Sequence, residues 1–223
     1  MITKFVTKNE TLGHAAVLPD DIATSRALYP CIIFLHGSGE RSSGLTELDL
    51  QKTVKLGPAK YLKDNRFIIL CPQTDGWSWR RTQWKDGVKI VTNDANEFTK
   101  WALQHYPIDP TRVYVRGLSM GGEGSWFAMA DDPELYAAGA PVCGRASRTE
   151  GDKIAGAGVH VWAFHGEDDT AIPFEQHWNA IIGMRTRNKS LIDFTVYERL
   201  GHSIWDKVYS NMALYSWFLR YTR

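Results

Sequence analysis

The sequence has few cysteines, almost no net charge and no long apolar run. Its three cysteines, Cys31, Cys71 and Cys143, are too few and too scattered for a disulfide framework or a cysteine-rich zinc site. Cys31 and Cys71 lie inside apolar runs and are expected to be buried, whereas Cys143, near a predicted strand end, has either a packing role or a role in a site. The 26 Lys and Arg residues nearly balance the 25 Asp and Glu residues, so no overall field attracts nucleic acid.

No apolar run reaches membrane-spanning length, and residues 1–10 lack the apolar segment of a signal peptide. We therefore expect no membrane and no nucleic-acid partner, and a cytoplasmic location, although a leader removed from the chain would leave no trace in it. The length of 223 residues and the 43% hydrophobic content fit one folded domain, residues 1–223. The oligomeric state does not follow from the sequence.

Short apolar runs alternate along the chain with longer segments of helical spacing. The predicted strands are 14–19, 31–35, 66–71, 112–116, 138–143, 159–164 and 193–197, the first of them at an edge of the sheet. The predicted helices are 53–63, 92–105, 122–130, 174–187 and 206–220. This alternation predicts an α/β fold with a mostly parallel central sheet and helices on both faces. In such a sheet, ligands bind beyond the carboxyl ends of the strands.

The sequence Gly117-Leu118-Ser119-Met120-Gly121 follows one predicted strand and precedes a helix. This is the G-x-S-x-G pattern of a nucleophile elbow, in which glycines allow the backbone to pass close to a serine on a sharp turn. The following helix N-terminus directs N–H groups toward the anion that forms in acyl transfer. The alternative is a glycine-rich turn that holds an incidental serine.

A serine nucleophile needs a base and a group that orients the base, and in α/β-hydrolases these follow in the order Ser, Asp or Glu, His. Asp168 and Asp169 follow the strand 159–164, and His202 follows the strand 193–197. We predict Ser119 as nucleophile, His202 as general base and one of the two aspartates as the orienting acid. Separately, His202 is also consistent with a packed loop histidine, and the aspartates with helix capping.

The strand 31–35 ends in His36-Gly37-Ser38-Gly39, an H-G-x-G turn. Hydrolases of this fold place an oxyanion-hole donor at this turn. We assign the two donors to the backbone N–H groups of Ser38 and Met120, each worth roughly 3–4 kcal/mol in the transition state. His36 is expected to support the loop.

With these segments in place, residues 30–220 resemble the phospholipase/carboxylesterase-like serine hydrolases. These are predicted peptidases of the prolyl-oligopeptidase group, near the dienelactone hydrolases and the feruloyl and acetylxylan esterases. The matching segments are LHGSGER at 35–41, LCPQ at 70–73, IDPTRVY at 108–114, GLSMGG at 117–122, AAGAPVCG at 137–144, FHGEDD at 164–169, Ile172-Pro173 and Gly201-His202. The resemblance implies a single α/β-hydrolase domain, and its pattern selects Asp169 over Asp168 as the acid.

Substrate contacts are less defined than the catalytic residues. The resemblance suggests a pocket role for Trp79, and Glu123 is either a helix N-terminal acid or a substrate contact. Trp77 is expected to pack under its loop. Arg80 and Arg81 are expected at the solvated surface, with pairing to an acidic substrate group as the alternative.

The remaining histidines, His105, His165 and His177, are expected to be structural, with His165 bracing the acidic turn. The predicted function is hydrolysis of a small-molecule carboxylic ester through an acyl-enzyme, with no metal and no organic cofactor implied. Two alternatives remain: a serine peptidase of the prolyl-oligopeptidase-like group, and a non-catalytic binding protein on a hydrolase fold.

Overall fold

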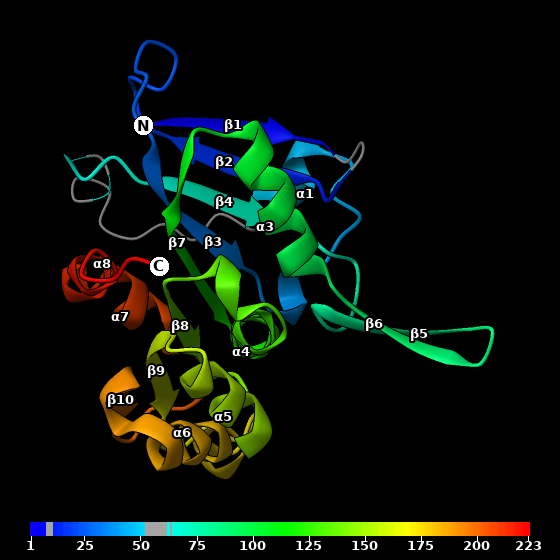
Figure 1. Cartoon of the computed structure of the whole chain (residues 1–223), viewed down its shortest axis with the longest axis vertical. Helices are drawn as coiled ribbons and strands as arrows, with labels where there is room; N and C mark the ends of the chain where they lie inside the picture. Colours follow the sequence, from blue (N-terminus) through cyan, green and yellow to red (C-terminus); the bar gives the residue numbers. More distant parts are fainter. Residues whose placement is uncertain (8–10, 52–61, 63) are drawn as a thin grey trace.

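The computed structural model describes residues 1–7, 11–51, 62 and 64–223, and it is organised around an eight-stranded sheet in the order β1-β2-β4-β3-β7-β8-β9-β10 (Figure 1). These strands are β1 (Ile2–Val6), β2 (His14–Leu18), β3 (Tyr29–Leu35), β4 (Ile68–Pro72), β7 (Ile108–Leu118), β8 (Ala138–Val142), β9 (His160–Gly166) and β10 (Ile192–Tyr197). All neighbours from β4 to β10 pair in parallel, and β1 and β2 add antiparallel strands at one side. The sheet is therefore mostly parallel, as predicted.

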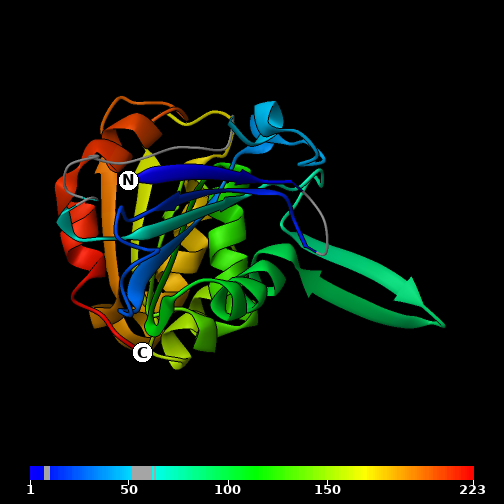
Figure 2. The ribbon, with the colours of Figure 1, turned by 90° about the horizontal axis from the view of Figure 1, so that it is seen from above.

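Helices cover both faces of this sheet. The helices are α1 (Glu47–Gln51), α3 (Asp94–His105), α4 (Met120–Asp131), α5 (Arg148–Gly156), α6 (Phe174–Asn188), α7 (Trp205–Ser210) and α8 (Met212–Phe218), with short 3₁₀ turns η1 (Ser38–Glu40), η2 (Pro133–Leu135) and η3 (Lys189–Leu191). Buried residues of α3, α4, α5 and α6 pack on one face, and those of α7 and α8 pack on the other (Figure 1, Figure 2). This arrangement confirms the predicted fold class, the α/β-hydrolase fold.

Strand β3 shows why its sequence is apolar throughout. All seven of its residues are buried, with Ile33 and Leu35 facing one layer of helices and Ile32 and Phe34 facing the other. Successive strand side chains point to opposite faces, so a strand covered on both sides has no polar positions.

Two element predictions are wrong. The strand near residue 14 is not at the edge, because Ile2–Val6 pairs with it as β1 and β2 is buried along its whole length. The segment 206–220 is not one helix, because Asn211 has an extended ψ of 110° between α7 and α8. The Asn211 side chain accepts a hydrogen bond from the Ala213 N–H and so caps α8. The predicted helix 53–63 lies almost entirely outside the described residues.

A second sheet, absent from the sequence-based prediction, consists of two antiparallel strands, β5 (Arg80–Lys85) and β6 (Val88–Asn93). They are joined by Asp86 and Gly87, both with positive φ, at 51° and 74°. Asp-Gly between two strands is a strong signal for a two-residue hairpin turn, so the sequence did contain this information. The hairpin extends away from the body of the molecule (Figure 1, Figure 2).

Candidate active site

The loops after β7, β9 and β10 carry Ser119, Asp169 and His202. These strands and the intervening β8 run parallel, so their carboxyl ends lie at one edge of the sheet. Residues that are far apart in the sequence therefore meet at this edge, where parallel α/β sheets bind ligands.

Ser119 lies in a strained turn between β7 and α4, with φ 53° and ψ −118°. Its N–H donates to the Val142 carbonyl at 2.9 Å, which attaches the turn to the end of β8. The helix crosses the sheet so closely that a Cβ on Gly121 would lie 2.0 Å from the Leu35 carbonyl oxygen, and one on Gly117 would lie 2.3 Å from the Gly121 oxygen. The two glycines of the motif are thus required by contact between backbones.

A continuous hydrogen-bonded series joins the three side chains. His202 Nε2 lies 2.8 Å from Ser119 Oγ, and His202 Nδ1 lies 2.7 Å from Asp169 Oδ2. With Nδ1–H donating to the carboxylate, Nε2 is free to accept the serine O–H, which is the orientation a general base needs.

Asp169 is buried and held by several groups. Its Oδ1 accepts hydrogen bonds from the N–H groups of Ala171 and Ile172, both at 2.9 Å, and its Oδ2 is 3.3 Å from His165 Nε2. Burial acts to raise the pKa of Asp169, but the hydrogen bonds from His202 and the Ile172 N–H outweigh it, and the pKa lies below its ordinary value. The carboxylate is therefore ionised at neutral pH.

Asp168 is arranged differently from its neighbour. Its side chain is exposed, and its N–H donates to the Leu200 carbonyl at 2.9 Å, which ties the acidic turn to the loop that carries His202. Of the two aspartates, Asp169 has the carboxylate bonded to His202.

The loop after β3 forms another wall of the site. His36 is buried there, accepts a hydrogen bond from the Thr74 N–H at Nε2 and lies 2.7 Å from the Gly37 carbonyl at Nδ1. Burial lowers the pKa of His36 to about 4, so the ring is neutral, and its contacts support the loop. Met120 is the first residue of α4, where backbone N–H groups have no partner within the helix.

A cavity of about 460 Å³ opens above Ser119. The loop after β3, the Ser119 turn and the loops that carry Asp169 and His202 contribute its walls, which are Gly37, Ser38, Gly39, Glu40, Leu118, Ser119, Ala171, Ile172, His202 and Trp205. Ser38 therefore faces the same space as Ser119 and His202. Two of these wall residues were not predicted as site residues: Glu40 lies inside the segment 35–41, and Trp205 lies three residues after His202.

The two tryptophan predictions are wrong. Trp79 is fully buried, donates from Nε1 to the His36 carbonyl at 3.3 Å and packs so closely on α4 that a Cβ on Gly124 would overlap its ring. Trp79 therefore packs against the loop after β3 and does not line the cavity. Trp77 is 78% exposed, and the Arg41 guanidinium lies 3.2 Å from its ring centroid. Trp77 therefore lies at the surface, where its ring is stabilised by the cation–π contact with Arg41, and it does not pack under the loop.

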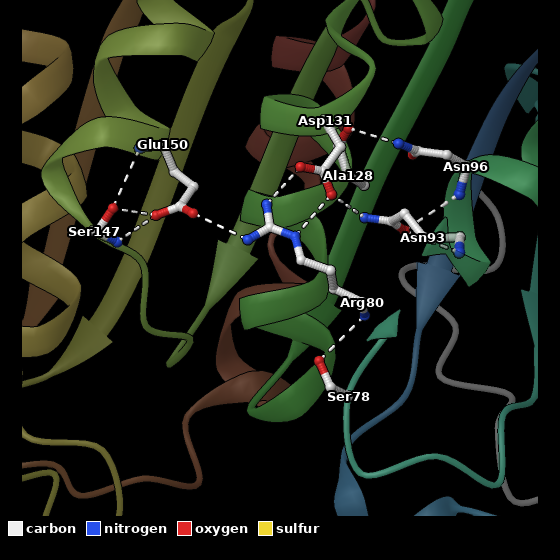
Figure 3. Close-up of polar contacts among 9 residues, drawn as sticks. Ser78, Arg80, Asn93, Asn96, Ala128, Asp131, Ser147 and Glu150 are labelled. Atoms are coloured by element: carbon white, nitrogen blue, oxygen red, sulfur yellow. Dashed lines mark hydrogen bonds and ion pairs between the residues drawn. The ribbon is translucent and has the colours of Figure 1, made fainter. Parts of the chain in front are cut away.

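The side chains of Arg80 and Arg81 are hydrogen-bonded to carboxylates of the same chain. Arg80 donates to both carboxylate oxygens of Asp131, at 2.8 and 2.7 Å, and to Glu150 at 3.0 Å (Figure 3). Arg81 donates to Asp94 at 2.6 Å and to Asp75 at 3.1 Å. Both guanidinium groups are thus paired within the chain. The Arg81 side chain is 37% exposed and lies at the surface as predicted, whereas the Arg80 side chain, 21% exposed, is less solvated than predicted.

Glu123 lies in the first turn of α4, and its carboxylate is 3.2 Å from Arg145 Nε. Burial raises the pKa of Glu123, and the Arg145 cation opposes this rise. Glu123 lines a second, shallow cavity of about 370 Å³ together with Arg145 and Phe127. It is absent from the walls of the cavity above Ser119.

Cys143 is a buried cysteine that lies next to Asp169 and His202. Its thiol, the Asp169 carboxylate and a His202 ring nitrogen all lie within 4.8 Å of one another, a spacing that a metal ion could use. However, burial raises the pKa of Cys143 to about 12, and the other two groups already bond to each other. A protonated thiol is not a metal ligand, so this set fits a hydrogen-bonded acid and base better than a metal site.

The three remaining predicted structural histidines have internal contacts. His165 Nε2 is 2.9 Å from the Ile172 carbonyl, so it braces the turn of Asp169, and His177 is buried against the Gly144 carbonyl. His105 stacks on Trp101 at 4.2 Å. Among the described residues, no helix is both long and apolar enough to cross a membrane.

The eight-stranded sheet has the α/β-hydrolase fold, and the bonded Ser-His-Asp series is the arrangement that serine hydrolases of this fold use. Residues 73–155 match the family model described as the prolyl oligopeptidase family. The chain is also 25% identical over 185 residues to acetylxylan esterase A of Emericella nidulans, a match that covers 80% of this chain and 51% of that protein. It thus spans about half the length of this curated relative.

Solved structures share the fold. A crystal structure of a thermostable esterase superimposes with a TM-score of 0.81 at 25% identity, covering 100% of this chain and 63% of that one. The acetyl xylan esterase of Aspergillus awamori superimposes with a TM-score of 0.69 at 16% identity, covering 98% and 99% of the two chains.

Proposed function

We propose that the protein hydrolyses carboxylic esters through an acyl-enzyme on Ser119. The observation that carries this proposal is the bonded series from Ser119 through His202 to Asp169, at 2.8 and 2.7 Å. A serine hydroxyl is a weak nucleophile unless a base accepts its proton, and the base works only in the correct tautomer and orientation.

In the first half of the reaction, Ser119 Oγ attacks the ester carbonyl carbon while His202 Nε2 takes the hydroxyl proton. The N–H groups of Ser38 and Met120 donate to the oxyanion, and the strained turn at Ser119 acts as the nucleophile elbow. His202 then gives the proton to the leaving alcohol, and the acyl group remains on Ser119. Asp169, ionised and buried, stabilises the imidazolium between these two transfers.

In the second half, water takes the place of the alcohol. His202 removes a proton from the water as its oxygen attacks the acyl carbon, and returns that proton to Ser119 Oγ as the acid leaves. The cavity of about 460 Å³ has room for a short acyl chain beside Leu118 and Ile172. The curated relative is called an acetylxylan esterase, so acetyl esters are the substrates we propose first.

A substrate panel tests this proposal. We expect p-nitrophenyl acetate to be hydrolysed with a higher kcat/KM than a long-chain acyl ester, methyl ferulate or an aminoacyl anilide. The anilide represents peptide hydrolysis, the second candidate, which the prolyl oligopeptidase match favours. A preference for the anilide would replace the esterase proposal with a peptidase. A folded protein that neither turns over any substrate nor reacts with a fluorophosphonate would be the non-catalytic alternative.

Activity is expected to fall as pH decreases, because a protonated His202 cannot accept the Ser119 proton. Asp169 does not contribute to this fall in activity, because its lowered pKa keeps the carboxylate ionised. The stability that the ionised carboxylate provides is lost only as the pH falls through that lowered pKa. A profile of kcat/KM from about pH 4 to about pH 9 should therefore show a single protonation on the acid side. A profile that stays flat down to about pH 4 would contradict a histidine base.

A further inference from the structure

The β5–β6 hairpin projects from the body of the molecule with both faces uncovered (Figure 1, Figure 2). We call residues 82–92 of this hairpin the arm. Every residue of the arm is exposed, including four apolar side chains: Trp84 at 71%, Val88 at 61%, Ile90 at 38% and Val91 at 47%. The feature is independent of the cavity above Ser119, because no arm residue lines that cavity.

The arm begins at a rigid root. Arg80 binds both carboxylate oxygens of Asp131 on α4 and one oxygen of Glu150 on α5, and Asn93 donates to the same Asp131 at 3.0 Å (Figure 3). The Arg80 guanidinium also lies 3.7 Å from the ring centroid of Phe127. Two helices of the body therefore fix the first and last residues of the hairpin, so the arm is held in one direction.

The strand register places apolar groups on both faces of the arm. Thr82 pairs with Val91 and Trp84 with Lys89, so Trp84 and Val91 share one face, while Val88 and Ile90 share the other. Both strands also have an unpaired outer edge among the described residues. An isolated two-stranded hairpin is marginally stable in water, and uncovered apolar side chains favour association.

We propose that the arm binds a second copy of this chain, forming a two-fold dimer in which two arms lie antiparallel and the tip of each reaches the root of the other. A two-fold interface needs a surface that complements itself, and a face of the arm that carries apolar side chains meets this requirement when two arms pack antiparallel, face to face. Each strand of the hairpin has six residues and spans about 20 Å. When two arms overlap fully in antiparallel orientation, the tip of each lies beside the root of the other.

Charge supports this pairing of tip with root. The tip, residues 85–89, carries Lys85, Asp86 and Lys89 and therefore has a net positive charge. A hollow of about 300 Å³ lies at the root, between β6, α3 and the end of α4. Its charged wall residues are Glu97, Asp131, Asp132 and Lys100, which forms ion pairs with Glu97 and Asp132, so the walls keep a net negative charge. In the antiparallel dimer, the basic tip of each arm meets the acidic hollow of the partner.

The required area favours a contact that involves more than one face. One face of the arm, about 20 Å long and about 10 Å wide, is well below the roughly 800 Å² per partner that a standard interface buries. Covering both faces doubles the buried area, and seating the tip in the partner's hollow adds to it. The proposal therefore places the partner's arm on one face and the partner's body on the other.

Sedimentation velocity with light scattering tests the proposal on the whole chain. Wild-type protein should have the mass of two chains rather than the 25.3 kDa of one. Trp84→Asp removes a large apolar side chain and places a negative charge near the partner's acidic hollow. It should therefore raise the dissociation constant of the dimer by about 30-fold or more. Leu48→Asp, at a side chain 67% exposed on α1, is the matched control and should leave the mass of a dimer.

A crosslink tests the geometry. The native cysteines Cys31, Cys71 and Cys143 are buried, so a mixture of Lys85→Cys and Glu97→Cys proteins should form a disulfide between chains. A monomeric wild type, a dimer that persists in Trp84→Asp, or no crosslink between these positions would each overturn the proposal. Fluorophosphonate labelling of each variant reports whether the body is folded, and the mass does not depend on whether the protein hydrolyses esters.

Discussion

Replacing Ser119 with alanine is expected to lower kcat for ester hydrolysis by about 10⁴-fold or more while the thermal midpoint stays close to that of the wild type. The substitution removes the only oxygen that His202 Nε2 contacts at 2.8 Å among the described residues, and with it the covalent intermediate. Residual turnover would come from the oxyanion donors and from binding alone. Steady-state kinetics with p-nitrophenyl acetate measure the effect.

Two controls accompany this variant. Ser216→Ala changes an exposed serine on α8 and should retain wild-type activity and fluorophosphonate labelling. Labelling of the wild type should map to Ser119 by mass spectrometry and vanish in Ser119→Ala. Activity that survives in Ser119→Ala, in protein free of wild type, would show that another group is the nucleophile.

Asp169→Asn is expected to lower kcat by about 10³- to 10⁴-fold, whereas Asp168→Asn should stay within about twofold of the wild type. Asparagine keeps the shape but removes the charge that stabilises imidazolium. Its NH₂ group also favours the wrong tautomer of His202, because a donor then faces Nδ1, 2.7 Å away in the wild type.

The adjacent pair makes this comparison a matched one. The two residues share a turn, but Asp168 is exposed and Asp169 is buried. Thermal unfolding should show a loss for Asp169→Asn as well, because a neutral amide oxygen accepts the hydrogen bonds from the Ala171 and Ile172 N–H groups less strongly than a carboxylate does. Equal losses of kcat in the two variants, or a larger loss in Asp168→Asn, would reverse the assignment of the acid.

The sequence predicted the elements whose residues are determined by burial on both faces. The run around Cys31–Leu35 is apolar at every position because helices cover both sides of β3, whereas a strand with one solvated face would alternate apolar and polar residues. The Ser119 turn was also predictable from the sequence, because close backbone contacts there allow only glycine at Gly117 and Gly121. Both features are local consequences of packing.

Features that depend on distant partners were not predictable in the same way. Whether Trp77 or Trp79 is buried depends on α4 and the loop at His36, which approach only in the folded chain. The edge position of the sheet belongs to β1, in which Thr3 and Lys4 are exposed and Phe5 and Val6 are partly buried, so these residues show no alternation of buried and exposed positions. The choice of Asp169 over Asp168 came from a family resemblance, and the hydrogen bond to His202 now gives it a geometric basis.

The positive φ of Ser119 also limits which residues evolution can place there. At φ 53° a side chain branched at Cβ clashes with its own backbone, so threonine, although it carries a hydroxyl, fits poorly. Cysteine has the same unbranched shape as serine and fits the turn. Descendants of this sequence can therefore exchange an oxygen nucleophile for a sulfur nucleophile in one substitution, whereas a threonine nucleophile would require the turn itself to be rebuilt.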